Sequence, residues 1–121
     1  MEVVLVKEFR FEAAHRLPEA PENHKCRRLH GHSFRVAVQV RGEVDPTTGW
    51  LMDYAAISAI VAPLIDAELD HRYLNDVPGL ANPTSENLAH WLWERLKPQL
   101  AALDELEVAE TCTATCRYRG K

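Results

Sequence analysis

The first part of the chain alternates between apolar and polar residues. From residue 2 to residue 15 the odd-numbered positions are mostly apolar, although Lys7 breaks the apolar face and Val4 and Val6 break the polar one. This period of two is typical of a strand with one buried face. A second alternating stretch covers residues 33–41, with an apolar side chain at every even position from 34 to 40. The two stretches predict an antiparallel pair of strands.

Helical spacing takes over after the turn-like segment at residues 45–49. Asp53 can cap a helix there, and Pro63 should bend or shorten that helix. Its apolar stripe consists of Ile57, Ile60, Val61 and Leu64. A second helix begins near Thr84 or Ser85, either of which can cap it. Its apolar stripe consists of Leu88, Trp91, Leu92 and Leu96.

Strand character returns between Leu106 and Tyr118, and a turn near Thr113 divides this segment into two short strands. The order strand, strand, helix, helix, strand, strand predicts an α+β fold, with both helices on the apolar face of a four-stranded antiparallel sheet. The other face would be charged, and its two edges would be open. Copies of the chain could therefore associate edge to edge and close their sheets into a barrel around a wet interior.

Composition narrows the class of protein. A chain of 121 residues, 46% hydrophobic and 26% charged, fits one globular domain spanning residues 1–121. The formal net charge of −4 provides no broad basic surface for nucleic acid. No apolar run approaches the ~20 residues of a membrane span, and no signal peptide is evident, so we expect a cytoplasmic protein with a small-molecule partner. Three cysteines are too few, and odd in number, for a disulfide framework.

Three histidines fall on the apolar faces of the predicted strands. His15 shares the odd-numbered face of the first strand, while His30 and His32 share the even-numbered face of the second. Residues two apart on a strand point the same way at a Cα separation of ~6.6 Å, from which both imidazoles can reach one metal ion. Three neutral nitrogen ligands leave the fourth position of tetrahedral Zn²⁺ open, as in catalytic sites. We therefore predict a zinc site.

Simpler interpretations exist for several of these residues. A single histidine near a strand end is more often an ordinary polar residue than a ligand, but three on apolar faces would leave several nitrogens without partners. We expect His24 and His90 to be surface residues. Cys112 and Cys116 have a C-x₃-C spacing that does not match a zinc knuckle, so we interpret both as structural.

The histidines belong to short motifs whose combination is highly specific. The motifs are Phe11-Glu12-Ala13-Ala14-His15, Cys26-Arg27-Arg28-Leu29-His30-Gly31-His32, Leu69-Asp70-His71, Pro83-Thr84-Ser85-Glu86-Asn87 and Glu110-Thr111. Together they resemble the tetrahydropterin-synthase family from near the first residue to the last strand. The three residues between Cys26 and His30 resemble its QueD branch, which forms 6-carboxytetrahydropterin. The animal pyruvoyl-tetrahydropterin synthases carry a longer insert there.

The resemblance implies the tunnelling fold, in which ββααββ subunits form trimer-based barrels that pair into hexamers, with active sites at subunit interfaces. It implies a pterin substrate, 7,8-dihydroneopterin triphosphate, and release of acetaldehyde and triphosphate in queuosine or another deazapurine pathway. Two alternatives remain open. One is a pyruvoyl-tetrahydropterin synthase, which retains the side-chain carbons, and the other is a non-catalytic module that binds a pterin or a metal.

The resemblance also implies how the metal and a cysteine act. The ligands of Zn²⁺ would be His15, His30 and His32. Cys26 would be the base that removes a proton as a thiolate, the form that nearby positive charge favours. The alternative for Cys26 is a buried structural thiol, which its polar loop disfavours.

Three further residues have implied roles. Asp70 and His71 resemble the family's second proton-transfer pair, although on the sequence alone they would be helix-terminal polar residues. Glu110 resembles the anchor that accepts hydrogen bonds from the pterin's amino group and ring N–H. Its alternative is a strand-end carboxylate that faces solvent. Weaker candidates for holding the same ring are Thr84, Ser85 and Thr111.

Overall fold

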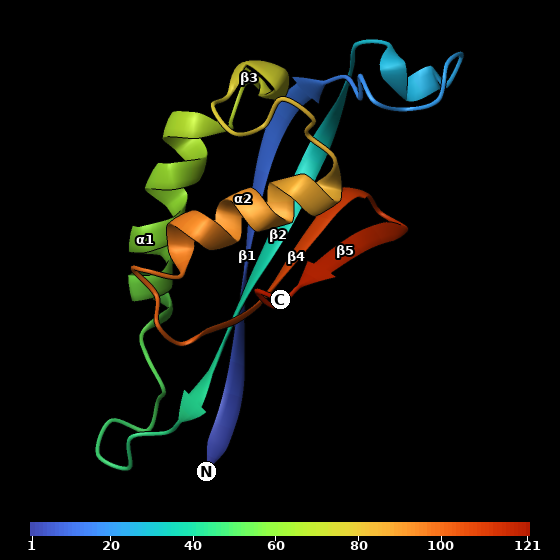
Figure 1. Cartoon of the computed structure of the whole chain (residues 1–121). Helices are drawn as coiled ribbons and strands as arrows, with labels where there is room; N and C mark the ends of the chain where they lie inside the picture. The colour runs from blue at the N-terminus through green and yellow to red at the C-terminus, as the bar shows by residue number, and fades with distance from the viewer.

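Two long paired strands lie at the centre of the fold, which the computed structural model describes for all of residues 1–121 (Figure 1). β1 (Glu2–His15) and β2 (His30–Glu43) run antiparallel, and their register carries from one end to the other, where His15 lies opposite His30. The first strand has the predicted bounds. The second extends beyond the predicted stretch at both ends because main-chain pairing with β1 continues after the alternation of side chains stops.

The sheet has five strands, so the predicted count of four is wrong. β3 (Arg72–Tyr73), β4 (Leu103–Thr111) and β5 (Ala114–Tyr118) complete it in the order β3-β1-β2-β4-β5. The four longer strands pair antiparallel as predicted, whereas β3 runs parallel to β1. The sequence does not reveal β3 because two residues are too few to show alternation. A hydrogen bond of the residue before β3 fixes the position of the strand: the His71 N–H donates to the Glu12 carbonyl oxygen at 2.6 Å.

Two helices begin at the predicted caps. α1 (Tyr54–Glu68) follows Asp53, whose carboxylate accepts from the backbone N–H two residues on at 2.8 Å. α2 (Ser85–Leu96) follows Thr84, whose hydroxyl accepts from the backbone N–H three residues on at 3.1 Å. Each cap satisfies a donor that the helix itself leaves free.

The buried face of α1 differs in detail from the prediction. Pro63 does not end the helix, which continues through it to Glu68. The fully covered side chains are Ile57, Val61 and Ile65, and the predicted Ile60 and Leu64 are only partly buried. Packing of this face against the sheet offsets the hydrogen bond that a proline removes.

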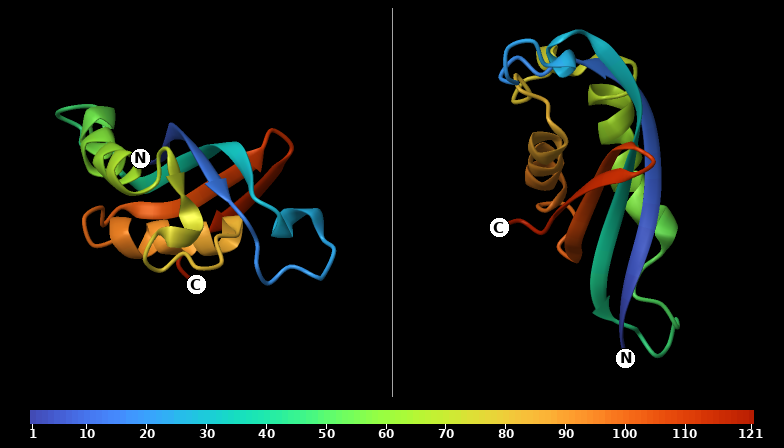
Figure 2. Two further views of the ribbon diagram at one scale, coloured as in Figure 1. Left: turned by 90° about the horizontal axis from the view of Figure 1, so that it is seen from above. Right: turned by 90° about the vertical axis from the view of Figure 1, so that its right-hand side faces the viewer.

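Both helices cover the same face of the sheet, since their buried side chains share one core with β2. The right-hand view in Figure 2 shows the long curved pair of β1 and β2 with α2 to one side of it. The core between the helices and the sheet includes every even-numbered residue of β2 from Phe34 to Val40, together with the apolar faces of α1 and α2. The whole predicted stripe of α2 is buried. One polar side chain, His15, is buried with this core. None of the helices is long and apolar enough to cross a membrane.

The opposite face of the sheet is charged, as predicted. Arg35 Nη1 lies 2.7 Å from Glu8 Oε1. Arg41 joins two partners, with Nη1 3.4 Å from Glu2 Oε1 and Nε 3.2 Å from Asp104 Oδ2. These charged side chains are therefore paired within the chain.

Candidate metal centre and the adjoining pocket

The three predicted metal ligands meet where β1 ends and β2 begins. His15 lies opposite His30 in the strand register, and His32 lies two residues further along the same face of β2. The ring centroids are 4.5 to 5.1 Å apart. One nitrogen of each ring lies within 4.8 Å of the other two. The structure therefore brings the predicted ligand set together.

Main-chain carbonyls orient two of these rings. His15 Nδ1 lies 2.8 Å from the Pro83 carbonyl oxygen, and His30 Nδ1 lies 2.7 Å from the Arg28 carbonyl oxygen. Because a carbonyl oxygen only accepts, Nδ1 of each ring must carry the proton and donate it. The lone pair is then on Nε2. Such a second hydrogen bond is the usual support of a metal-binding histidine.

Burial leaves two ring nitrogens without partners. The Nε2 atoms of His15 and His32 are both buried and form no hydrogen bond. Desolvation lowers the pKa of His15 below its ordinary value, although the Pro83 carbonyl and the charge of Glu110 oppose the shift. Desolvation likewise lowers the pKa of His32, again opposed by Glu110. Both rings are therefore neutral near pH 7, which is the form that binds a metal.

Glu110 is the carboxylate nearest to these rings. It lies near the end of β4 and points to the same side of the sheet as the histidines, with its Oε2 3.8 Å from His32 Nε2. That distance is too long for a hydrogen bond. The side chain is 26% exposed, so at least one carboxylate oxygen remains available to a ligand.

Cys26 lies on the long loop between β1 and β2, in the short 3-10 helix η1 (Lys25–Arg27). The Cys26 N–H donates to Nδ1 of His24 at 3.1 Å, and the Cys26 carbonyl oxygen accepts from the Leu17 N–H at 2.7 Å. His24 is exposed, as predicted, and it also caps the turn that carries the cysteine. Its position two residues before Cys26 was the available signal, since side chains that accept from the N–H two residues on are common at helix starts.

One pocket joins the cysteine, two of the histidines and the carboxylate. It has a volume of about 570 Å³. Its lining residues include Lys25, Cys26, Arg28, His30, His32, Glu110 and Thr111. This volume is within the range of small-molecule sites. The pocket can therefore place a ligand against the histidine cluster, a thiol and a carboxylate at the same time.

Asp70 and His71 form the predicted pair directly after α1. His71 Nδ1 lies 2.9 Å from Asp70 Oδ2, and Asp70 Oδ1 accepts from the Glu12 N–H at 3.0 Å. These hydrogen bonds, the one from the Glu12 N–H first, hold the pKa of Asp70 below its ordinary value. Asp70 is therefore an acceptor near pH 7, and His71 Nδ1 must carry the proton that it donates.

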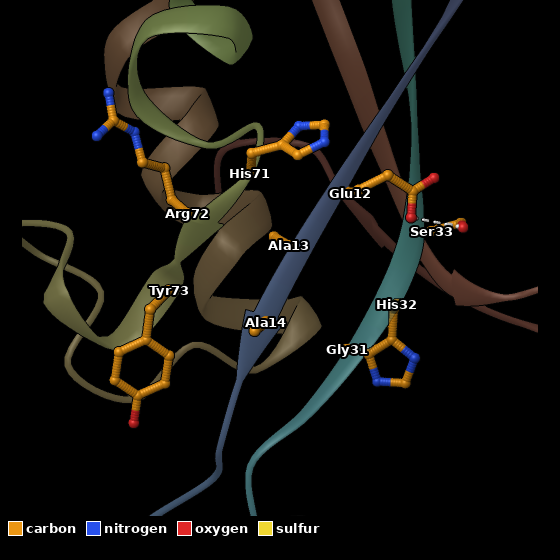
Figure 3. A pocket seen from close by; sticks show the side chains of 9 residues that line it. All are labelled: Glu12, Ala13, Ala14, Gly31, His32, Ser33, His71, Arg72 and Tyr73. Atoms are coloured by element: carbon orange, nitrogen blue, oxygen red, sulfur yellow. Dashed lines mark hydrogen bonds between the residues drawn. The ribbon is translucent and has the colours of Figure 1, made fainter.

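This pair does not share the pocket of Cys26. His71, with 78% of its side chain exposed, lines a second pocket of about 560 Å³ beside β1. Figure 3 shows His71 and Tyr73 on one side of β1, and Ser33 and His32 on the other. Asp70 and His71 are absent from the lining of the first pocket. Within one chain, the two predicted proton-transfer groups are thus separate.

Of the remaining predicted residues, one lines the pocket of Cys26 and two do not. Thr111 lines the pocket of Cys26. Thr84 and Ser85 do not line it, because the Thr84 hydroxyl caps α2 and the Ser85 hydroxyl donates to Glu86 at 2.9 Å. Two contributions that the sequence did not reveal are the carbonyl groups of Pro83 and Arg28, which carry no side-chain signal.

Comparison with known proteins gives a consistent picture. The model of the 6-pyruvoyl tetrahydropterin synthase family matches residues 4–121. A Synechocystis protein described as 6-carboxy-5,6,7,8-tetrahydropterin synthase is 47% identical over 120 residues, covering 95% of this chain and 92% of that protein. A Pyrococcus furiosus protein described as dihydroneopterin monophosphate aldolase is 39% identical over 90 residues, covering 74% and 71%.

Solved structures agree with these matches. The 6-pyruvoyl tetrahydropterin synthase of Caenorhabditis elegans superposes with a TM-score of 0.91 at 32% identity. The match covers 100% of this chain and 97% of that one. The chain therefore belongs to the 6-pyruvoyl tetrahydropterin synthase family.

Proposed function

We propose that this chain is a zinc-dependent lyase. It converts 7,8-dihydroneopterin triphosphate to 6-carboxy-5,6,7,8-tetrahydropterin, with release of acetaldehyde and triphosphate, in queuosine or another deazapurine pathway. The observation that carries the proposal is the pocket in which Cys26 and Glu110 adjoin a histidine cluster with two unpartnered Nε2 atoms. The similarity to the Synechocystis protein favours the carboxylated product.

The histidine cluster fits the proposed zinc ion. Its three rings are close together, carbonyl groups orient those of His15 and His30, and the Nε2 atoms of His15 and His32 are buried without a partner. A zinc ion held by His15, His30 and His32 would polarise the hydroxyl groups of the substrate and make the neighbouring C–H bonds more acidic. The three imidazoles would hold this ion, and the burial of the Nε2 atoms of His15 and His32 keeps competing solvent from them.

Cys26 and Glu110 act on the substrate itself. Cys26, only partly buried in its polar loop, removes a proton from a carbon of the substrate side chain as a thiolate. Glu110 accepts hydrogen bonds from the pterin's amino group and ring N–H, and this pairing orients the side chain toward Cys26. Thr111, next to Glu110 on the pocket wall, can bond the same ring.

Asp70 and His71 carry the second proton transfer. With Nδ1–H bound to Asp70, His71 presents Nε2 for the exchange of a proton with the substrate. The separation of this pair from Cys26 supports active sites shared between copies of the chain, since His71 of one copy can then serve Cys26 of another. Trimer-based barrels that pair into hexamers, closed through the sheet edges β3 and β5, are the assembly that we propose. In the same assembly Thr84 and Ser85 are weaker candidates for binding the pterin.

The test is incubation of the zinc-loaded protein with 7,8-dihydroneopterin triphosphate, followed by mass analysis of the pterin and assay of acetaldehyde. We expect a carboxypterin and acetaldehyde. A pyruvoyl product without acetaldehyde would assign the chain to the pyruvoyl reaction instead, which the fold of the Caenorhabditis elegans enzyme accommodates equally well. Pterin binding without any product would leave a non-catalytic module.

A further inference from the structure

The loop between β1 and β2 carries positive charges that no carboxylate neutralises. Residues 16–29 contain four basic residues and two acidic ones. The basic residues are Arg16, Lys25, Arg27 and Arg28, and the acidic residues are Glu19 and Glu22. None of the four basic side chains forms an ion pair. A shortage of carboxylates is not the reason, because the chain as a whole has a net charge of −4.

Two of these side chains line the pocket of Cys26. Lys25 and Arg28 form part of its wall together with the histidines and Glu110. Arg27, which lies between them, instead donates from Nη1 to the Ala20 carbonyl oxygen at 2.9 Å. Neither Lys25 nor Arg28 donates a side-chain hydrogen bond within the chain, whereas seven other Lys and Arg residues do. Arg16 also donates no side-chain hydrogen bond, but it does not line this pocket, so Lys25 and Arg28 are the free cations of the loop that do.

We propose that Lys25 and Arg28 bind the phosphate groups of the substrate. The inference rests on the proposed function, which places a phosphorylated pterin in this pocket. If Glu110 holds the ring and the histidine centre faces the side-chain hydroxyls, the phosphates, attached to the last carbon of the side chain, lie beyond the histidines and away from Glu110. The loop supplies two donors there: an ammonium that acts as a point charge, and a guanidinium that can bind two phosphate oxygens at once.

A different role for the same charges makes a different prediction. If Lys25 and Arg28 only favoured the thiolate of Cys26, replacing them would lower kcat and leave affinity unchanged. If they bind phosphate, the loss appears in the affinity for phosphorylated ligands alone. An unreactive ligand pair therefore separates the two roles.

The experiment is a fluorescence titration of the zinc-loaded protein with neopterin and with neopterin triphosphate, oxidised pterins that do not react. We expect the triphosphate to bind about 10- to 100-fold more tightly than neopterin at low salt, because charge-assisted hydrogen bonds are strong. Lys25→Gln/Arg28→Gln should remove most of that difference and leave the affinity for neopterin unchanged. Raising the salt concentration should weaken only the phosphate-dependent part.

The matched control is Lys7→Gln/Lys121→Gln, which removes the same charge from side chains outside the pocket and outside any ion pair. It should keep the preference for the triphosphate. Zinc content and circular dichroism show whether the loop variant stays folded, as expected since both altered side chains are exposed.

The outcomes separate this inference from the proposed function. Equal affinity of the wild type for the two ligands overturns the phosphate role while the pterin site stands, and so does a preference that survives the loop double variant. If neopterin binds to none of the proteins, the pterin site fails. Inorganic tripolyphosphate then decides the role of the loop: saturable binding lost in the double variant supports it, and any other result overturns it.

Discussion

At the end of the sheet where the chain begins, Asp104 accepts hydrogen bonds from Gln39, Arg41 and Arg119 at 2.9 to 3.2 Å. At the other end, two buried histidine nitrogens have no partner. Partners hold the pKa of Asp104 down at about 2, the Arg119 hydrogen bond contributing most. Burial lowers the pKa values of His15 and His32 with only partial compensation.

The difference shows which polar groups serve the fold and which are left for a ligand. Charges that pair within the chain stabilise the sheet and have little left to offer to a second molecule. A buried polar atom without a partner costs free energy, so its presence indicates a partner that comes from outside. The same contrast holds between the paired arginines of the sheet and the unpaired Lys25 and Arg28 of the loop.

The largest expected effect follows from removing a histidine at the end of the sheet where the three rings meet. His30→Ala removes a proposed metal ligand, so zinc content should fall well below one ion per chain and turnover should fall with it. Added zinc should restore part of the activity. Metal analysis after dialysis, together with the turnover assay, measures both. His90→Ala is the control, because His90 is an exposed residue of α2 whose one ion pair is with Glu94, away from the cluster. Full zinc content in His30→Ala would show that the ligand set is wrong.

Cys26→Ala should separate chemistry from metal binding. We expect turnover to fall by ~10²–10⁴, the usual loss for a general base, while zinc content and folding stay near those of the wild type. Steady-state kinetics and metal analysis give the two numbers. Cys112→Ser, at an exposed thiol outside the pocket, serves for comparison. If Cys26→Ala lost its zinc while His30→Ala kept it, the proposed roles of Cys26 as the base and His30 as a ligand would both be wrong.

Glu110→Gln tests the pterin anchor. The amide can accept only one of the two hydrogen bonds from the ring and directs an N–H at the other donor. Neopterin affinity should therefore fall by about 10- to 100-fold in a fluorescence titration. Glu107→Gln changes a carboxylate on the same strand that pairs with Arg117 instead, and it should bind neopterin like the wild type. Equal affinities for the two variants would leave Glu110 without this role.

The smallest effect on activity is expected from a substitution at the opposite end of the sheet, where Asp104 accepts hydrogen bonds from within the chain. Asp104→Asn weakens three hydrogen bonds, so the melting temperature should fall by a few degrees with no change in zinc content or turnover. Because the folded pKa of about 2 lies below the unfolded value of about 3.9, the stabilisation is present above pH 4 and is lost as pH falls toward 2. The difference in melting temperature between the wild type and Asp104→Asn should therefore become smaller as the pH falls from 4 to 2. Asp66→Asn, at an exposed position of α1, is the control, and a difference independent of pH would refute the ionic origin.

Much of the fold could be predicted from local patterns. Alternation gave the bounds of β1, and the capping residues Asp53 and Thr84 gave the starts of both helices. The two-residue strand β3 could not be predicted, because it depends on hydrogen bonds between Glu12 and the chain after α1. The buried Ile65 was missed because a period of 3.6 residues permits either neighbour until the packing partner is known.

In the site, too, local patterns predicted some features, and contacts between distant parts of the chain determine the others. Strand parity predicted that His15, His30 and His32 converge, since side chains on one face of paired strands must meet. Sequence could not predict that a carbonyl 68 residues away, that of Pro83, would orient His15. Contact between the adjacent Asp70 and His71 also depends on the loop conformation, in which His71 has a φ of 59°.

The central claim is that the unpartnered histidine nitrogens hold a metal ion with one position open to substrate. Cobalt substitution tests it most directly, because the absorption spectrum reports both the number of ligands and their type. We expect about one cobalt ion per chain, the d–d bands of a tetrahedral site and no strong thiolate charge-transfer band. An intense charge-transfer band that disappears in Cys26→Ala would show that the thiol closes the site, and the absence of stoichiometric binding would contradict the metal centre itself.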